Sequence, residues 1–240
     1  MKKTISFALG NIWRWSESKN RDDLIPYAKK LNISGVEITF SSKEELYALK
    51  ISEDNLNWLK SLEYVTIHAP FRLTRKADND AEIIKQCEFI LKLYQQINAK
   101  NVIIHPLDLP APEILAKYPF KVSTENLVRK RNVTIADLQK IFEKYPKMGL
   151  CLDVAHAYLW SKDETRKLVN AFGDKITQVH FSGTYRKKDH QSLRIVTKDF
   201  LDSIEPVKKL TVPIVIEEDI QIKDESFLKE EVEYIKKMFE

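Results

Sequence analysis

Acidic and imidazole side chains recur at the ends of short apolar stretches in this chain. The clearest case is the stretch 149–157, GLCLDVAHA, in which an apolar run ends at Asp153 and His156 follows three residues later. Packing alone gives a carboxylate and an imidazole little reason to stand there. Eight residues, including all five histidines, lie at or just past an expected strand end: His68, His105, Glu125, Asp153, His156, His180, His190 and Glu217.

Taken singly, each of these residues is more simply explained as a core or loop residue whose polar atoms are hydrogen-bonded. Burying several carboxylates and imidazoles together is costly unless a compensating charge lies among them, and a divalent cation supplies it. Carboxylate and imidazole ligands without thiolates favour Zn²⁺, Mn²⁺, Fe²⁺ or Co²⁺ over Mg²⁺ or Ca²⁺. Because eight donors exceed one coordination shell, we expect one to three ions, zinc or manganese, with a bridging carboxylate.

These side chains can meet only if the strands that carry them lie side by side. Apolar runs typical of buried strands alternate with helical patterns eight times. The expected strands span residues 4–9, 35–39, 64–68, 101–105, 121–125, 149–153, 176–180 and 213–217. The expected helices span residues 22–31, 42–61 with a break near 51–53, 80–97, 134–145, 162–172, 198–209 and 225–239. A proline-rich loop over 106–119 has room for one helical turn.

Two helix starts carry capping signals. Asp22 is a plausible N-cap, and Thr134 with Asp137 resembles a capping box in which Asp replaces the usual Glu. Eight strand–helix units in 240 residues predict an α/β fold, a single (β/α)₈ TIM barrel with one domain over residues 1–240. A doubly wound sheet is the alternative, but the glycine-rich phosphate loop that it normally carries after the first strand is missing at residues 10–13.

Composition narrows the function classes only partly. The net charge of +4 is compatible with an anionic substrate or nucleic acid and requires neither. No stretch approaches a membrane span or a complete signal peptide, so we expect a cytoplasmic protein without membrane contact. Cys87 and Cys151 are expected to be buried thiols. Glu37, in the second expected strand, either contacts substrate or is a buried polar residue.

Positive charge gathers in loops that follow the strands. It forms either a solvated surface or a rim that binds phosphate. The residues concerned are Arg14, Arg72, Arg75, Lys76, Arg129, Lys130, Arg131, Arg186, Lys187 and Lys188.

A series of motifs in a fixed order resembles the xylose isomerase-like TIM barrel superfamily. This superfamily includes the sugar phosphate isomerase/epimerase group and endonuclease IV, of AP endonuclease family 2. The motifs run through most of the chain: SGVEITF, VTIHAPF, NVIIHP, VSTEN, GLCLDVAHA, ITQVHFSG, DHQSL and VPIVIEE.

The resemblance implies roles for the eight residues. Glu125, Asp153, His180 and Glu217 match the metal shell of the isomerases and epimerases. Glu125 and Glu217 would also be the acid/base pair, and His156 would hold a substrate hydroxyl. The additional ligands of the multinuclear endonuclease-type site are matched by His68, His105 and His190.

The chain departs from the endonuclease pattern at three places, one of which is the absence of the glycines that often follow the last histidine. Lys188 replaces the Asp that commonly stands two positions before the last histidine, although Asp189 is adjacent. The acidic residue that usually follows His180 is absent, because the chain reads Ser182-Gly183-Thr184. These departures weigh against a third ion and against full nuclease chemistry.

Three functions follow, in order of preference. The first is a divalent-metal-dependent isomerase or epimerase acting on a sugar or sugar phosphate, in which Glu125 and Glu217 move the proton. The second is an endonuclease IV-like zinc phosphodiesterase acting on abasic DNA. The third is a barrel that binds a ligand without turnover.

Overall fold

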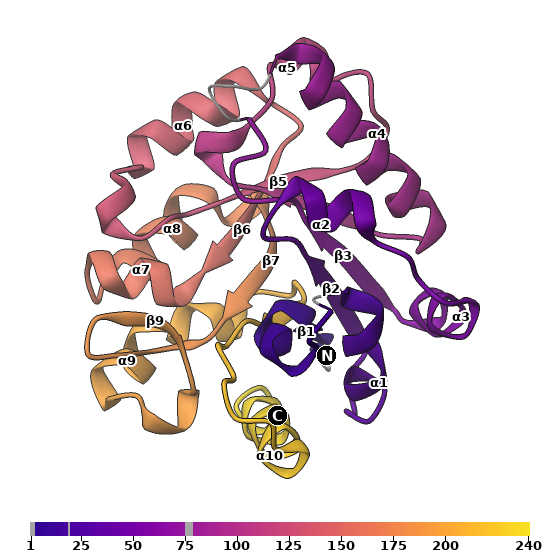
Figure 1. Ribbon diagram of the computed structural model, residues 1–240. Helices are drawn as coiled ribbons and strands as arrows, with labels where there is room; N and C mark the ends of the chain where they lie inside the picture. The colour runs from indigo at the N-terminus through magenta and orange to yellow at the C-terminus, as the bar shows by residue number, and fades with distance from the viewer. Residues whose placement is uncertain (1–2, 19, 75–78) are drawn as a thin grey trace.

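Eight parallel strands close into a barrel in the computed structural model, which describes residues 3–18, 20–74 and 79–240 (Figure 1). Around the barrel the order is β1-β10-β7-β6-β5-β4-β3-β2, and all eight neighbouring pairs are parallel. The barrel strands are β1 (Ile5–Ala8), β2 (Gly35–Thr39), β3 (Tyr64–His68), β4 (Asn101–Ile104), β5 (Val122–Glu125), β6 (Gly149–Asp153), β7 (Ile176–Phe181) and β10 (Ile214–Ile216). The predicted (β/α)₈ barrel is confirmed.

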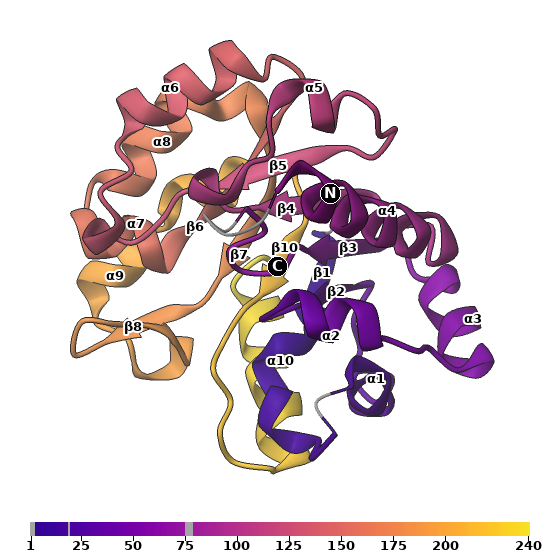
Figure 2. The ribbon, with the colours of Figure 1, turned by 45° about the horizontal axis from the view of Figure 1, so that its top comes forward.

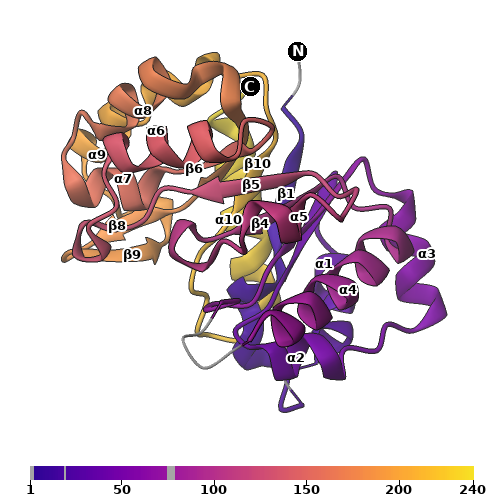
Figure 3. The ribbon, with the colours of Figure 1, turned by 90° about the horizontal axis from the view of Figure 1, so that it is seen from above.

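Helices surround the strands. Figure 3 shows α1 to α4 on one side of the barrel strands and α6 to α9 on the other. The helices are α1 (Ile25–Ala28), α2 (Lys43–Ala48), α3 (Glu53–Ser61), α4 (Asp80–Gln96), α5 (Pro112–Leu115), α6 (Ile135–Lys144), α7 (Val154–Trp160), α8 (Glu164–Phe172), α9 (Lys198–Ser203) and α10 (Glu225–Lys237). Because helices cover the outside, the barrel strands are buried on both faces and read as near-continuous apolar runs.

The chain ends meet where α10 packs beside the first residues (Figures 1 and 2). Trp15 Nε1 donates a hydrogen bond of 3.2 Å to the carbonyl of Ile220, and Lys30 pairs with Glu225 at 2.6 Å. These contacts fasten the segment after β1 to the segment after β10. They therefore support the closure that places the first and last strand ends side by side.

Prolines shorten two predicted helices. The helix expected over 22–31 is a 3₁₀ turn, Arg21–Leu24, followed by α1. Asn20 caps the turn by accepting from Asp22 N, so the expected N-cap at Asp22 is wrong. Pro26 and Pro206 lack the N–H that a continuous helix requires, and the helix expected over 198–209 is likewise divided into α9 and a 3₁₀ segment, Glu205–Lys209.

Other boundary predictions hold. The break near 51–53 separates α2 from α3. The proline-rich loop holds α5 and also a 3₁₀ turn, Pro106–Asp108, so it contains two helical turns where one was expected. Thr134 caps α6, and Asp137 completes the capping box. Cys87 and Cys151 are free and buried, as expected.

A hairpin that the sequence pattern does not predict follows β7. Strands β8 (Gly183–Tyr185) and β9 (Lys188–Gln191) pair antiparallel, and Figures 1 and 2 show them beside α7 and α9. The two turn residues, Arg186 and Lys187, have φ values of 49° and 64°. Two-residue hairpin turns with positive φ normally carry Asn or Gly, so Arg186 and Lys187 do not predict a turn from the sequence. His190, expected in a loop, therefore lies in β9.

Candidate metal centre

The structure brings the eight predicted side chains together at the carboxyl ends of the barrel strands. Their ligand atoms form three groups, and within each group all these atoms lie within 4.8 Å of one another. The groups are His68, His105 and Glu125; Asp153, His156 and His190; and Glu125, Asp153, His180 and Glu217. We call this arrangement the cup. Parallel strand ends meet at one rim of a barrel, which explains how residues so distant in sequence converge.

Glu125 lies between the groups. Its Oε2 is 3.5 Å from His68 Nε2 and 3.3 Å from His105 Nε2. Its Oε1 is 3.4 Å from His156 Nδ1 and 3.2 Å from His180 Nδ1. Because Glu125 belongs to two of the three ligand groups, one with His68 and His105 and one with Asp153, His180 and Glu217, its carboxylate would be shared if both groups held a cation.

Backbone carbonyls orient three of the imidazoles. A carbonyl only accepts, so an imidazole Nδ1 in hydrogen-bond contact with it carries the proton and leaves the Nε2 lone pair free. The three contacts are His68 Nδ1 to Ala69 O at 3.0 Å, His156 Nδ1 to Asn126 O at 3.0 Å and His190 Nδ1 to Glu217 O at 2.9 Å. In the neutral form of these three rings, Nε2 is therefore the nitrogen that can bind a cation.

Asp153 links the end of β6 to the helix that carries His156. Its Oδ1 accepts from His156 N at 2.6 Å and so caps α7, a helix that the sequence pattern does not predict. Asn126 fixes the strand end by donating to Asp153 O and accepting from Asp153 N, each at 2.8 Å. The signal that could have found α7 is Asp153 itself, because Asp is a preferred N-cap residue as well as a plausible strand end.

Two buried carboxylate oxygens in the cup lack a hydrogen bond. Asp153 Oδ2 and Glu217 Oε2 have no donor among the described residues. Glu217 Oε2 nevertheless lies 2.7 Å from His180 Nδ1. Unpaired buried oxygens against imidazole nitrogens are costly alone and fit a shared cation, and the carboxylate and imidazole donors suit a borderline divalent ion.

The charges in the cup shift the pKa values of its members. Burial raises the pKa of Asp153 to about 6, although His156 beside it works in the opposite direction. Burial acts the same way on Glu217, but His180 and His190 outweigh it and lower that pKa to about 2. Burial alone would lower the pKa of His180, yet the surrounding anionic groups hold it well above its ordinary value. The cup therefore favours positive charge at its centre.

His190 is held in a strained conformation. Its φ of 52° lies in the left-handed region, which a histidine adopts at a cost. Its carbonyl accepts from Asp219 N at 2.7 Å, and its Nδ1 contact to Glu217 holds the other side. Both contacts join β9 to the segment after β10, so they place this imidazole over the cup.

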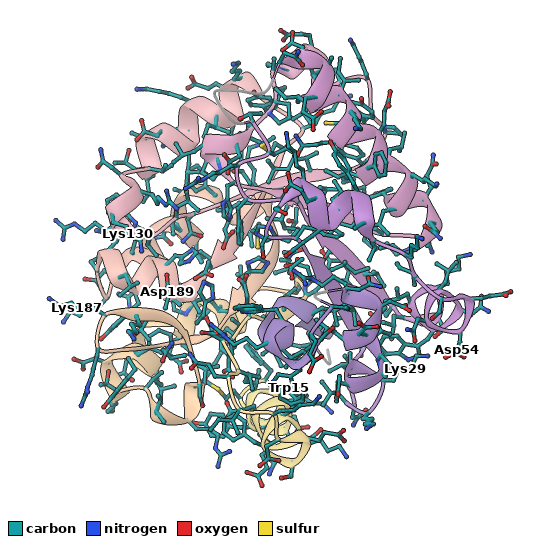
Figure 4. The ribbon with its side chains drawn as sticks, viewed as in Figure 1. Trp15, Lys29, Asp54, Lys130, Lys187 and Asp189 are labelled. Atoms are coloured by element: carbon teal, nitrogen blue, oxygen red, sulfur yellow. The ribbon has the colours of Figure 1, made fainter. Side chains whose placement is uncertain are left out.

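Lys188 stands where the family pattern has an Asp, but the carboxylate of the adjacent Asp189 lies near His156. Its Oδ2 is 3.5 Å from His156 Nε2, and a hydrogen bond with that imidazole lowers the pKa of Asp189 to about 2. Figure 4 shows Asp189 directed toward the barrel and Lys187 directed outward. The neighbouring carboxylate thus lies beside the group of Asp153, His156 and His190.

Two cavities flank the cup. One of about 390 Å³ is lined by residues that include Trp13, Arg14, Phe71, Lys188 and Glu217. The other, of about 420 Å³, lies beside His105 and is lined by Phe71, Arg72, Leu107, Asp108 and Arg131 among others. Basic side chains therefore reach both cavities.

Some of the basic loop residues fit a rim that binds phosphate, and others fit a solvated surface. Arg72, Arg131 and Lys188 line the cavities, whereas Lys130 and Lys187 point away from the barrel (Figure 4). Arg14 is paired with Asp219 and stacks on Trp13 with 4.3 Å to the ring centroid. Arg75 and Lys76 lie outside the described residues.

Comparison with known proteins agrees with this geometry. The sequence profile of the family described as xylose isomerase-like TIM barrel matches residues 109–208. The matched residues make up less than half of the chain and belong to the closed parallel barrel. A search of curated proteins found no match. In the part of the chain that the structure describes, no helix is both long and apolar enough to cross a membrane.

Solved structures with the same fold carry several activities in their names. A D-tagatose 3-epimerase-like protein is 17% identical with a TM-score of 0.66, covering 99% of this chain and 100% of its own. Endonuclease IV from Thermus thermophilus is 17% identical with a TM-score of 0.66, covering 98% and 97%. The probable 3-DHS dehydratase AsbF from Bacillus anthracis is 14% identical with a TM-score of 0.70, covering 98% of both chains. This chain thus shares its fold with proteins named as enzymes of different reaction classes.

Proposed function

We propose that this chain is a divalent-metal-dependent phosphodiesterase with zinc as its leading ion and abasic DNA as its leading substrate. The observation that carries the proposal is Glu125, whose two oxygens face two different pairs of imidazoles at 3.2–3.5 Å. A carboxylate shared in this way suits a pair of ions. For this reason we place the phosphodiesterase before the isomerase or epimerase, whereas the sequence favoured the opposite order.

A base that removes a proton from carbon needs a free oxygen and a pKa near the working pH. Burial alone would raise the pKa of Glu125, but His180 and the other imidazoles around it hold that pKa well below its ordinary value. Glu217, the other member of the expected acid/base pair, has a pKa of about 2. The imidazoles of the cup thus stabilise the anionic form of both carboxylates, which suits ligands of a cation.

The residues of the chain divide the work of phosphodiester cleavage. The eight predicted residues would hold the ions, which when bound acidify a water molecule and offset phosphate charge. Arg72, Arg131 and Lys188, on the cavity walls, would contact phosphate oxygens on either side of the cup. The buried lower half of the cup would exclude bulk water from the reacting atoms.

The isomerase or epimerase remains the second candidate, supported by a different observation. Glu125, Asp153, His180 and Glu217 form one compact group, and a cavity of about 390 Å³ that Glu217 lines suits a sugar or sugar phosphate. In such an enzyme His156 would hold a substrate hydroxyl. The structural likeness to a D-tagatose 3-epimerase-like protein supports it.

One set of assays separates the candidates. Zinc-loaded protein is incubated with an abasic-site duplex and, separately, with a panel of ketoses in deuterated water. We expect strand cleavage at the abasic site, reduced more than about 100-fold in Glu125→Gln because the variant loses a shared ligand rather than an outer partner. Exposed Glu143 provides the matched control, Glu143→Gln. Deuterium in the ketoses without strand cleavage would instead establish the second candidate, and silence in both assays with zinc bound would favour a binding protein.

A further inference from the structure

Glu37 lies beneath the cup, and the proposed function gives it no task. It is the middle residue of β2 and is fully buried. Its side chain contacts residues of β7, which is not a neighbour of β2, so it lies inside the barrel. Since an ionised carboxylate is costly to bury, the contacts of Glu37 decide what it does.

Two donors hold one oxygen of Glu37. Thr66 Oγ1 and Gln178 Nε2 each donate to Glu37 Oε2 at 2.9 Å. The amide of Gln178 is itself oriented, because its oxygen accepts from Tyr64 at 2.9 Å. Glu37 Oε1 has no hydrogen-bond partner among the described residues, although it lies 3.1 Å from His180 Nε2. The hydrogen bond between His180 Nε2 and the carboxylate, 3.4 Å long, is to Glu37 Oε2. The side chain is thus fixed by its Oε2, and both of its oxygens face the imidazole.

His180 is turned the opposite way to the three imidazoles that donate from Nδ1 to a carbonyl. Its Nδ1 faces the cup, 2.7 Å from Glu217 Oε2 and 3.2 Å from Glu125 Oε1. Its Nε2 faces downward to Glu37. Gln178 Nε2 is 3.2 Å from the same imidazole nitrogen and donates to Glu37 Oε2, so the amide and imidazole nitrogens both lie against the carboxylate.

We infer that Glu37 is a positioning residue that accepts the Nε2–H of His180 and thereby directs the Nδ1 lone pair into the cup. This inference rests on the metal centre of the proposed function. A carboxylate behind a ligating imidazole fixes its tautomer and ring orientation and raises its basicity. Loss of such a partner typically lowers metal affinity roughly 10–100-fold.

The test compares Glu37→Gln with Glu231→Gln. Glu231, on α10, is also fully buried, accepts from Ser192 at 2.8 Å and contacts none of the eight predicted ligands. Zinc affinity is measured by competition with a chelator, and thermal midpoints are measured for metal-free and zinc-loaded protein. We expect E37Q to weaken zinc binding roughly 10–100-fold, so that zinc raises the thermal midpoint of the variant less than it raises that of the wild type. E231Q should leave zinc affinity unchanged.

Two results would overturn the inference. One is an unchanged zinc affinity in E37Q. The other is an equal loss of stability in its metal-free and zinc-loaded forms, which would make Glu37 a structural residue only. Neither readout depends on the reaction. Weakened zinc binding in E37Q without phosphodiester cleavage by the wild type would therefore reject the proposed reaction and leave the inference standing.

Discussion

Glu125 and the imidazoles around it show what single residues contribute to this cup. The identity of the donors sets the class of cation, and the backbone carbonyls behind His68, His156 and His190 set which ring nitrogen is free. The side chain of Asp153 has two tasks, because one oxygen caps α7 and the other stays unpaired. Asp153 can thus cap a helix with one oxygen and offer the other to a cation.

Asp189 and Lys188 allow a test on adjacent residues. If Asp189 supports the group of Asp153, His156 and His190, then Asp189→Asn should lower the zinc content of the purified protein by one ion per chain. Lys188→Ala should leave the ion count unchanged, because that side chain lines the cavity and belongs to none of the ligand groups. Elemental analysis after dialysis measures both. An equal ion count in D189N and wild type would show that Asp189 does not support an ion at this group.

At the scale of elements, local signals set some boundaries and tertiary contacts set others. The capping box at Thr134 and the prolines at 26 and 206 act within a few residues, so they operate wherever the segment lies. The β8–β9 hairpin has no such signal, since Arg186 and Lys187 are ordinary residues at positive φ. The hairpin is held instead by contacts of β9, such as the hydrogen bond from Asp219 N to His190 O.

The capping box gives a prediction about stability and pH. Hydrogen bonds from Thr134 lower the pKa of Asp137 below its ordinary value. A carboxylate with a lowered folded-state pKa stabilises the fold fully above its unfolded pKa of about 3.9, and this contribution is lost as the pH falls through the lower folded-state value. The difference in unfolding free energy between wild type and Asp137→Asn should therefore be constant above about pH 5 and shrink toward pH 3.

Urea denaturation between pH 3 and pH 7 measures this difference. Thr134→Ala, which removes the cap itself, should cost about 1 kcal/mol at pH 7. Zinc affinity should be unchanged in both variants, because α6 contributes none of the ligand candidates. A difference between wild type and D137N that grew as the pH fell would contradict the assignment.

At the scale of the whole molecule, the cup gathers residues from 68 to 217 that end or follow six of the barrel strands. An ion bound there links elements from most of the circumference, and it binds only the folded chain. Zinc at roughly 1,000 times its dissociation constant should then stabilise the fold by about 4 kcal/mol. Thermal midpoints with and without a chelator measure this stabilisation. E125Q should respond less, and a midpoint indifferent to zinc in the wild type would exclude a tightly held ion.

The sequence by itself determined the barrel, because eight apolar runs separated by helical patterns leave few other folds for a chain of this length. It also determined which residue types stand at the strand ends, since strand register puts each of them at a known place. The cytoplasmic location stays a prediction. Only the tertiary structure decided that Glu125 faces two pairs of imidazoles, that Asp189 approaches His156, and that Glu37 lies behind His180. These are contacts across the barrel, between residues whose separation along the chain carries no information about distance, so they depend on how the strands close rather than on any local pattern.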